Sequence, residues 1–237
     1  MIKVTELHKS YGLVQALRGA KFEARDGEIT TLLGANGSGK TTTMRSLVGL
    51  IRPDQGNVEI DTVNVLQDAQ QARAKMGWFP DNVGLYPRLT TREHISYFAR
   101  LHGLQGSDLE RAIDRVITLL DIGDIADRRV EGFSTGQSMK VALARVLVHK
   151  PKNLVLDEPT RGLDVTSIRQ LRALLRELRE AGHCILMSSH VMAEVQELSD
   201  RVVFIARGVV VADGTPAELI ELADAANLED AFVALVA

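Results

Sequence analysis

The sequence predicts an α/β fold in which a parallel β-sheet forms the core, an antiparallel β layer lies beside it and a helical lobe is inserted. Two continuous apolar runs, Asn153–Leu156 and Cys184–Met187, are typical of strands that are buried on both faces of a parallel sheet. Short half-polar segments separated by turns occupy the N-terminal part, as is usual for antiparallel pairing. From about residue 81 to residue 150 the strand signal disappears and helical periodicity takes over.

The composition is that of a globular chain able to bury a sizeable core. Its 237 residues are 45% hydrophobic and 25% charged, and no fixed-period repeat or low-complexity linker divides them. We therefore expect a single domain over residues 1–237. Its core would comprise residues 1–80 and 151–237, with a helical subdomain from about residue 81 to residue 150.

Charge and patterning narrow the class of protein and its compartment. The formal net charge of −3 argues against nucleic acid as the main partner, because binding phosphates requires a surplus of Lys and Arg. No apolar run approaches the roughly 20 residues of a spanning helix, and the N-terminus lacks the pattern of a signal peptide. We expect a cytoplasmic protein whose single cysteine, Cys184, is a buried structural thiol without a disulfide partner.

The antiparallel layer is expected from three segments near the N-terminus, Ile2–Leu7, Gly19–Ala24 and Asn57–Val65. In the lobe, helical periodicity predicts helices over Arg92–Leu101 and Asp108–Leu120. Near the C-terminus, Asn227 has the character of an N-cap residue before a short amphipathic helix, for which packing is the expected role.

A phosphate-binding loop is predicted at Gly34–Thr41, which matches GxxxxGK[ST]. The apolar strand Ile29–Leu33 precedes it and the expected helix Thr42–Leu50 follows it, which is the context of a P-loop NTPase. Glycines let backbone N–H groups curl around a phosphate, while Lys40 would reach the β and γ phosphates and Thr41 would bind Mg²⁺. A glycine turn that binds nothing is the alternative. The expected nucleotide contacts are Gly34, Asn36, Gly37, Ser38, Gly39, Lys40, Thr41 and Thr42.

Two adjacent carboxylates, Asp157 and Glu158, end the buried strand that begins at Asn153. Ligands of α/β proteins bind at this edge of the sheet, and two neighbouring buried acids are costly without a cation. Asp157 is therefore the candidate Mg²⁺ ligand, directly or through water. Glu158 is the candidate base that polarises the attacking water. The alternative is a solvated strand end before the turn at Pro159.

A second candidate anion site lies at Phe133–Gln137, before the helical run Ser138–Val148. Ser134 and Gly136 would stand at a helix N-terminus, where backbone N–H groups and the helix dipole favour anions. An ordinary helix cap explains both residues equally well.

The order of these motifs resembles that of ATP-binding-cassette (ABC) ATPases over nearly the whole chain. The P-loop, Ser134-Thr135-Gly136-Gln137, Asp157-Glu158, Arg161-Gly162-Leu163-Asp164 and Ser188-Ser189-His190 follow one another as in that family. The resemblance implies the ABC ATPase fold, ATP and Mg²⁺ as cofactors, and Mg-dependent, transport-coupled ATP hydrolysis. It also implies a head-to-tail dimer with a second copy of the chain, in which Ser134, Gly136 and Gln137 of one copy meet the ATP held by the P-loop of the other.

The resemblance gives further residues their expected roles. It makes Glu158, His190 and Lys40 the catalytic residues, His190 contacting the γ phosphate and orienting the water. Asp164 would communicate across the dimer. Tyr11 falls where the family places an aromatic that stacks on adenine, although a strand-end aromatic in a turn is the alternative.

The signature and two further positions depart from the family pattern. The signature reads Phe133-Ser134-Thr135-Gly136 instead of the commoner Leu-Ser-Gly-Gly, although Ser134 and Gly136 are kept. Asp81 stands where many members carry a glutamine, and Arg161 replaces the usual small residue before Gly162. A carboxylate at position 81 could bind Mg²⁺ more strongly than an amide, yet it adds negative charge beside phosphates. Asp81 is therefore a candidate Mg²⁺ ligand with Thr41 and Asp157, with Asn82 as a substitute.

The sequence resembles one branch of the family, the NatA-like ATPase subunits of bacterial exporters. The resemblance is carried by these departures and by the segments Gly84–Thr90 and Leu228–Phe232. The resemblance implies an integral-membrane permease as partner and a peripheral position on the inner face of the plasma membrane. It leaves the cargo open between Na⁺ and a drug or other substrate. The sequence also leaves open a soluble ABC ATPase and a non-catalytic regulatory subunit. The permease groove is expected at Trp78, Phe79, Leu85, Tyr86 and Leu89, which could instead pack the lobe against the core.

Overall fold

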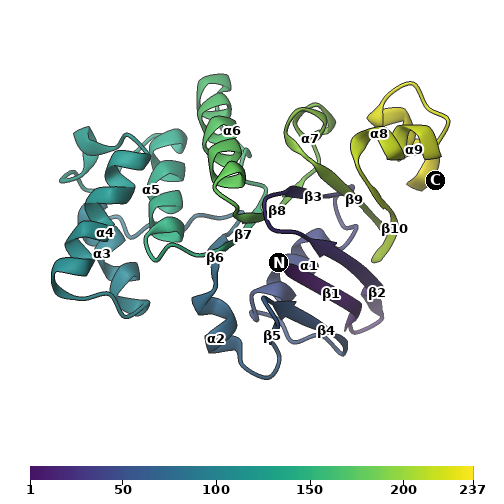
Figure 1. Ribbon diagram of the computed structural model, residues 1–237, viewed down its shortest axis with the longest axis horizontal. Coiled ribbons are helices and arrows are strands. Elements are labelled where there is room, and N and C mark those ends of the chain that lie inside the picture. Colours follow the sequence, from purple (N-terminus) through teal and green to yellow (C-terminus); the bar gives the residue numbers. More distant parts are fainter. Residues whose placement is uncertain (237) are drawn as a thin grey trace.

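The computed structural model describes residues 1–236, so Ala237, the last residue of the expected domain, lies outside the described part. Two β-sheets with helices packed around them make up the fold (Figure 1). The four-stranded sheet has the order β2-β1-β4-β5, and the six-stranded sheet has the order β10-β9-β3-β8-β7-β6.

The four-stranded sheet is the predicted antiparallel layer, since each neighbouring pair of its strands runs antiparallel. Its strands are β1 (Ile2–Tyr11), β2 (Val14–Ala24), β4 (Gln55–Ile60) and β5 (Val63–Asn64). The expected segment Asn57–Val65 belongs to this layer but contributes two strands, β4 and β5. Asp61 and Thr62 adopt positive φ angles of 46° and 72°, which turn the chain back and divide the segment into two short strands.

The six-stranded sheet is the predicted parallel core. Its strands are β3 (Ile29–Leu33), β6 (Met76–Phe79), β7 (Asn153–Asp157), β8 (Cys184–Ser189), β9 (Arg201–Ala206) and β10 (Val209–Gly214). β6, β7, β8, β3 and β9 run parallel, and β10 is an antiparallel strand at the edge. The carboxyl ends of β3, β7 and β8 consequently meet at one edge of the sheet.

Burial of the core strands agrees with their apolar sequences, because every residue of β7 and β8 is buried. Cys184 is fully buried on β8, where its Sγ donates a hydrogen bond to the carbonyl oxygen of Ala24 (3.3 Å). Burial raises the pKa of the thiol to about 12, so the expected structural cysteine is confirmed.

The helices lie on both sides of the sheets and at the two ends of the molecule (Figure 1). They are α1 (Lys40–Leu47), α2 (Ala69–Ala74), α3 (Thr91–Leu101), α4 (Gly106–Leu119), α5 (Thr135–Leu147), α6 (Val165–Glu180), α7 (Met192–Leu198), α8 (Pro216–Leu222) and α9 (Leu228–Val236), with a short 3₁₀ helix, η1 (Gly123–Ile125). Between β6 and β7 the chain forms α3, α4 and α5, which lie together at one end. Within residues 1–236, no helix has both the length and the apolar character needed to cross a bilayer.

Local capping fixes where several helices begin. Thr90 and Glu93 form a capping box at α3, and Ser134 and Gln137 form one at α5, which begins at Thr135 rather than at the expected Ser138. Asn227 is the predicted N-cap of α9, since its Oδ1 accepts a hydrogen bond from the N–H of Asp230 (2.9 Å).

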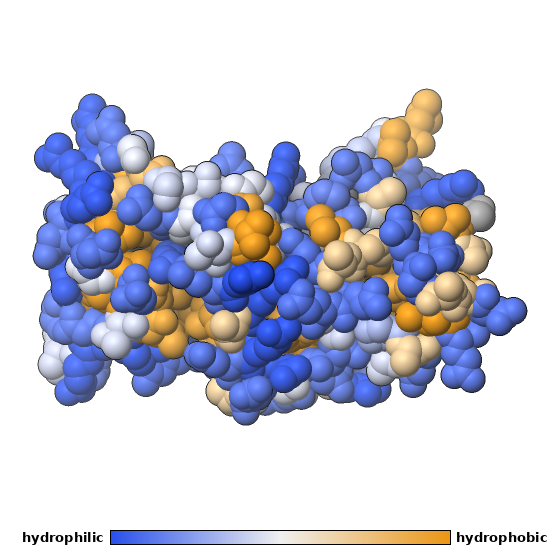
Figure 2. All heavy atoms as spheres, turned by 90° about the horizontal axis from the view of Figure 1, so that it is seen from above, coloured by the Kyte–Doolittle hydropathy of each residue, from blue (hydrophilic) through white to orange (hydrophobic). Residues whose placement is uncertain are grey.

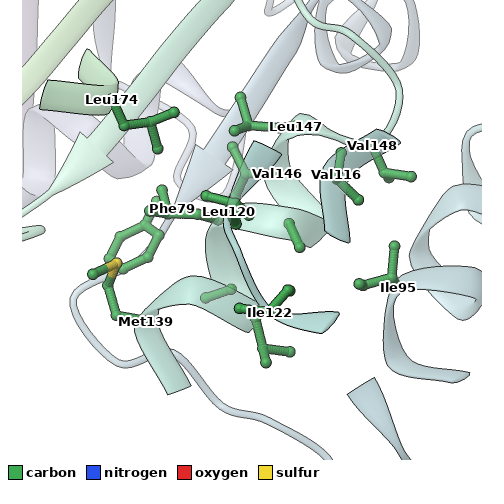
Figure 3. Packing of buried hydrophobic residues seen from close by; sticks show 14 of the residues in the cluster. Phe79, Ile95, Val116, Leu120, Ile122, Met139, Val146, Leu147, Val148 and Leu174 are labelled. Carbon is green, nitrogen blue, oxygen red and sulfur yellow. The ribbon is translucent and has the colours of Figure 1, made fainter. Parts of the chain in front are cut away.

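One apolar cluster joins the helices of the lobe to the parallel sheet (Figure 3). Phe79 from β6 lies beside Met139 from α5, with Leu120 and Leu174 nearby from the end of α4 and from α6. Phe79 is only 3% exposed, so it belongs to the core and the expectation that it faces a permease groove is wrong. These buried apolar side chains anchor the lobe to the sheet.

The other residues expected at the groove are not gathered on one surface. Trp78 packs against the cluster beneath the antiparallel layer, and Leu85 packs against the cluster of the lobe. Tyr86 is half-exposed, with its ring 5.6 Å from that of His94. On the face seen from above, hydrophobic side chains form separate groups among hydrophilic ones (Figure 2).

Candidate functional site

The predicted phosphate loop connects β3 to α1, as the sequence indicated. A Cβ on Gly34 would lie 2.4 Å from the carbonyl oxygen of Ile205, so only glycine fits this close approach. Gly39 has a φ angle of 112° immediately before α1, which begins at Lys40 and not at the expected Thr42. Lys40 and Thr41 therefore lie in the first turn of the helix, where free N–H groups and the helix dipole favour an anion.

Two side chains of this loop are arranged for a ligand. The Ser38 hydroxyl is buried and has no hydrogen-bond partner within the described residues. The Lys40 side chain is 6% exposed, and its Nζ donates hydrogen bonds to the carbonyl oxygens of Gly34 (2.7 Å) and Ala35 (3.3 Å). These carbonyl oxygens hold the Lys40 Nζ beside the loop, where it can donate to an anion placed over the loop.

A buried hydroxyl on the neighbouring strand organises the acidic pair at the end of β7. Ser188 on β8 donates a hydrogen bond to Asp157 Oδ1 (2.6 Å), and its Oγ accepts one from the backbone N–H of Glu158 (2.9 Å). The other oxygen of Asp157, Oδ2, is buried and has no partner within residues 1–236. Burial, with smaller contributions from the charges of Asp81 and Glu158, raises the pKa of Asp157 above its ordinary value.

Glu158 lies close to Lys40 and His190, the two other residues expected to be catalytic. Its φ angle of 50° turns the chain sharply after β7, and its side chain is 12% exposed. One carboxylate oxygen lies 3.7 Å from Lys40 Nζ, and the other lies 2.8 Å from His190 Nδ1. The structure thus brings together a cation at the start of α1, a carboxylate just after β7 and an imidazole just after β8.

A cavity of about 1160 Å³ opens over this group. Its volume is sufficient for a ligand of nucleotide size. Tyr11 is a half-exposed residue of its wall, with Lys9 Nζ 5.6 Å from the centre of the ring. The predicted site residues in the wall are Tyr11, Asn36, Gly37, Gly39, Lys40, Thr41, Thr42, Asp81, Glu158 and His190.

The second predicted anion site does not face this cavity. Ser134, Gly136, Gln137 and Asp164 are not among the residues that line it within the described chain. Ser134 caps α5, accepting a hydrogen bond from the N–H of Gln137 (3.2 Å), as the alternative of an ordinary cap required. Asp164 caps α6, where hydrogen bonds from the backbone N–H and hydroxyl of Ser167 lower its carboxyl pKa.

The residues present fit a magnesium ion. The unpartnered oxygen of Asp157 is a hard, buried donor, and Thr41 and Asp81 lie in the wall of the adjacent cavity. Among residues 1–236, no three His, Cys, Asp or Glu side chains are grouped so that they could hold a metal by themselves. Mg²⁺ commonly takes only one or two carboxylates from a protein and completes its octahedron with phosphate oxygens and water.

Sequence reasoning missed two participants. Ser188 belonged to the quoted Ser188-Ser189-His190 motif, but nothing in the sequence shows that it links Asp157 to Glu158. Arg161 departs from the family pattern, but its position 4.0 Å from Asp81 depends on the pairing of β6 with β7 and on the turn that follows β7.

Comparison with known families matches residues 17–161 to the family described as "ABC transporter". The chain belongs to this family, so both the resemblance found in the sequence and the predicted ABC ATPase fold are confirmed.

Among curated proteins, it resembles the ABC transporter ATP-binding protein NatA of Bacillus subtilis (strain 168). The two are 35% identical over 238 residues, which cover 98% of this chain and 97% of that protein. It is also 35% identical to the bacitracin transport ATP-binding protein BcrA of Bacillus licheniformis, over 88% of this chain and 67% of that protein.

Solved structures agree on the fold. The structure of an ATP-binding subunit of an ABC transporter matches with a TM-score of 0.91 and 27% identity, over 99% of both chains. A bacterial ABC transporter cassette solved as a dimer matches with a TM-score of 0.83 over 91% of this chain and 98% of that chain. Its 24% identity supports likeness of fold alone.

Proposed function

We propose that this chain binds and hydrolyses MgATP as the motor subunit of an ABC exporter. The observation that carries the proposal is the convergence of Lys40, Glu158 and His190 at the wall of a cavity bounded by the phosphate loop. Membership of the ABC transporter family supports it, as do relatives named for ATP binding in transport.

The phosphates would be held by the loop and the first turn of α1. Backbone N–H groups of this segment supply fixed partial positive charge, and the free hydroxyl of Ser38 supplies a further donor. The contacts would come from Gly34, Asn36, Gly37, Ser38, Gly39, Lys40, Thr41 and Thr42, with Tyr11 stacking on adenine. All of these except Gly34 and Ser38 line the cavity.

Thr41, Asp157 and Asp81 would hold Mg²⁺, the last two directly or through water. When bound, the ion neutralises charge that develops on the phosphate oxygens. The unpartnered oxygen of Asp157 supports this assignment, because a buried carboxylate oxygen without a donor is costly unless a cation faces it.

Glu158 would polarise the attacking water by accepting its proton, as a carboxylate at the end of a strand can do. His190 contacts the Glu158 carboxylate and would orient the water against the γ phosphate. Lys40 would move from the loop carbonyls to the β and γ phosphates, where its charge stabilises the transferring group.

The active unit would be a head-to-tail dimer of two copies. The location of three residues supports this dimer. Ser134, Gly136 and Gln137 lie at the N-terminus of α5 and do not line the cavity of their own chain. A second copy could place this helix end against the phosphates, and Asp164 would lie near the same contact. Each ATP would then need one P-loop and the other copy's signature.

We further propose that residues from about 81 to 150 act as a helical subdomain and that an integral-membrane permease docks where it meets the core. Half-exposed Tyr86, and Leu85 packed on the cluster of the lobe, support this site, whereas Trp78 packs beneath the antiparallel layer and Phe79 is interior. The chain would thus be cytoplasmic and held at the inner face of the plasma membrane by the permease.

The cargo is proposed in two forms. The resemblance of the sequence to the NatA-like branch favours Na⁺ export. Similarity to a bacitracin transport protein and to Nod factor export ATP-binding proteins favours a drug or other organic substrate. Transport into inverted vesicles that contain the chain and its permease would separate the two.

Replacing Glu158 by Gln tests the proposed chemistry. The variant should still bind ATP but hydrolyse it at least about a hundredfold more slowly, because the water loses its base. Glu180→Gln, at an exposed residue near the end of α6, is the matched control and should hydrolyse ATP at the wild-type rate. Unchanged turnover in Glu158→Gln would contradict the assignment.

A further inference from the structure

Two of the residues that depart from the family pattern, Asp81 and Arg161, lie next to each other in the structure. Asp81 follows β6 and Arg161 lies in the turn after β7, and the parallel pairing of these strands brings the two side chains to 4.0 Å between Oδ2 and Nη1. They are far apart in the sequence, so their proximity is a product of the fold.

The pair is oriented by its surroundings. The other oxygen of Asp81, Oδ1, accepts a hydrogen bond from the N–H of Asn82 (2.9 Å), which leaves Oδ2 for the guanidinium. The backbone N–H of Arg161 donates to the carbonyl oxygen of Glu158 (3.1 Å). Arg161 is therefore carried on the same turn as the proposed catalytic base.

Both side chains face the proposed nucleotide site. Asp81 and Arg161 line the large cavity together with Lys40, Thr41 and Glu158. They also line a smaller cavity of about 250 Å³ that continues toward Phe133 and Thr135 at the start of α5. The ion pair thus stands between the phosphate loop and the helix proposed to meet the other copy's ATP.

The charge of Asp81 would oppose a nucleotide if it were unbalanced. Asp157 and Glu158 already place two carboxylates at this edge of the sheet, and the phosphates of ATP add several more negative charges. Arg161 is 67% exposed, so solvent screens the attraction between the two side chains, but a positive charge 4.0 Å from Asp81 still lowers the net negative charge that the phosphates meet. With a neutral glutamine at position 81, as in many members of the family, there would be no negative charge for a residue at position 161 to neutralise.

We propose that Arg161 is a positioning residue that neutralises Asp81 and so permits a carboxylate beside the nucleotide phosphates and their Mg²⁺. Arg161 acts through Asp81, and the two residues work as a unit that replaces an uncharged pair. The inference rests on the proposed function, because it concerns how that site accepts MgATP.

The test is equilibrium binding of a fluorescent ATP analogue, measured without turnover in wild type, Arg161→Ser, Asp81→Asn and the double variant. Without Mg²⁺, Arg161→Ser should weaken binding on the order of tenfold, since Asp81 then faces the phosphates unbalanced. With Mg²⁺, which roughly halves the net negative charge of ATP, the loss should shrink to about threefold. High salt should reduce both effects.

The variants of Asp81 supply the decisive comparison. Asp81→Asn should tighten Mg-free binding, because Arg161 becomes a free cation beside the phosphates. The double variant should return to within about twofold of wild type, since the charges cancel again. The matched control is the pair Asp108 and Arg111 on α4, where Asp108→Asn, Arg111→Ser and their double variant should leave binding unchanged.

The outcomes separate this inference from the proposed function. Failure of the wild-type chain to bind any ATP would overturn the proposed function and the inference with it. Binding by wild type, with a double variant as weak as Arg161→Ser alone, would overturn the inference only. That second result would mean that Arg161 acts on the loop structure or on the phosphates directly, not through Asp81.

Discussion

Replacing Ser188 by Ala should destabilise the whole domain, although the residue has no direct part in the proposed chemistry. Its hydroxyl is fully buried between β7 and β8, where it donates to the Asp157 carboxylate and accepts from the N–H of Glu158. A hydrogen bond to a charged group contributes about 1.5–3 kcal/mol and a neutral one about 0.5–1.5 kcal/mol. Their loss predicts a decrease of about 2–4 kcal/mol in the free energy of unfolding.

Urea unfolding followed by circular dichroism measures this change. If the denaturant slope is about 3 kcal/mol per molar, the midpoint of Ser188→Ala should fall by about 1 M. Ser189→Ala is the control. Within residues 1–236 the Ser189 hydroxyl takes part in one hydrogen bond, which it accepts from the N–H of Val191 (3.0 Å), and its loss should cost about 1 kcal/mol. Equal losses in the two variants would refute the reasoning that Ser188 holds the acidic pair in place.

Three further predictions concern stability and binding. Because burial raises the pKa of Asp157 above its ordinary 3.8, the folded chain binds this proton more tightly than the unfolded chain, and the resulting stability falls as pH rises through the folded pKa. Asp157→Asn should therefore have a larger free energy of unfolding than wild type at pH 7, and the difference should shrink toward about pH 4. Urea unfolding at several pH values measures this difference, and a difference that does not change with pH would contradict the prediction. Phe79→Ala should lower the free energy of unfolding, measured in urea, by about 3–5 kcal/mol. Tyr97→Ala removes a half-exposed ring and should lower it clearly less, so similar losses in the two variants would place Phe79 outside the core. Tyr11→Ala should weaken ATP binding about tenfold through lost stacking while Tyr11→Phe binds normally; identical affinities in all three proteins would remove Tyr11 from the adenine site.

The elements with strong local signals were predictable from the sequence. β3 was predicted with its observed bounds, and the glycine pattern after it placed the phosphate loop, because both signals lie within a few neighbouring residues. The capping box of Ser134 and Gln137 is equally local, and it explains why α5 begins at Thr135 instead of the expected Ser138. The turn at Asp61 and Thr62 was missed because neither residue is glycine, although both have positive φ angles.

Contacts between segments that are distant in the chain could not be predicted from the sequence. The motif order indicated that Lys40, Glu158 and His190 serve one site, but their distances depend on the strand order β3-β8-β7. The hydroxyl of Ser188 and the pairing of Asp81 with Arg161 likewise arise from neighbouring parallel strands. Phe79 could not be assigned to groove or core from an aromatic pattern alone, since both uses favour the same residue type.

The central claim is that one phosphate loop is half of an ATP site, completed by a second copy of the chain. Its most direct test is the mass in solution of Glu158→Gln, measured by light scattering with and without MgATP. The claim predicts a change from 25.9 kDa to twice that mass when ATP is added, and no change when Gly136→Asp is also introduced into the signature. A variant that binds ATP and stays at the monomer mass, or a double variant that still dimerises through ATP, would contradict it.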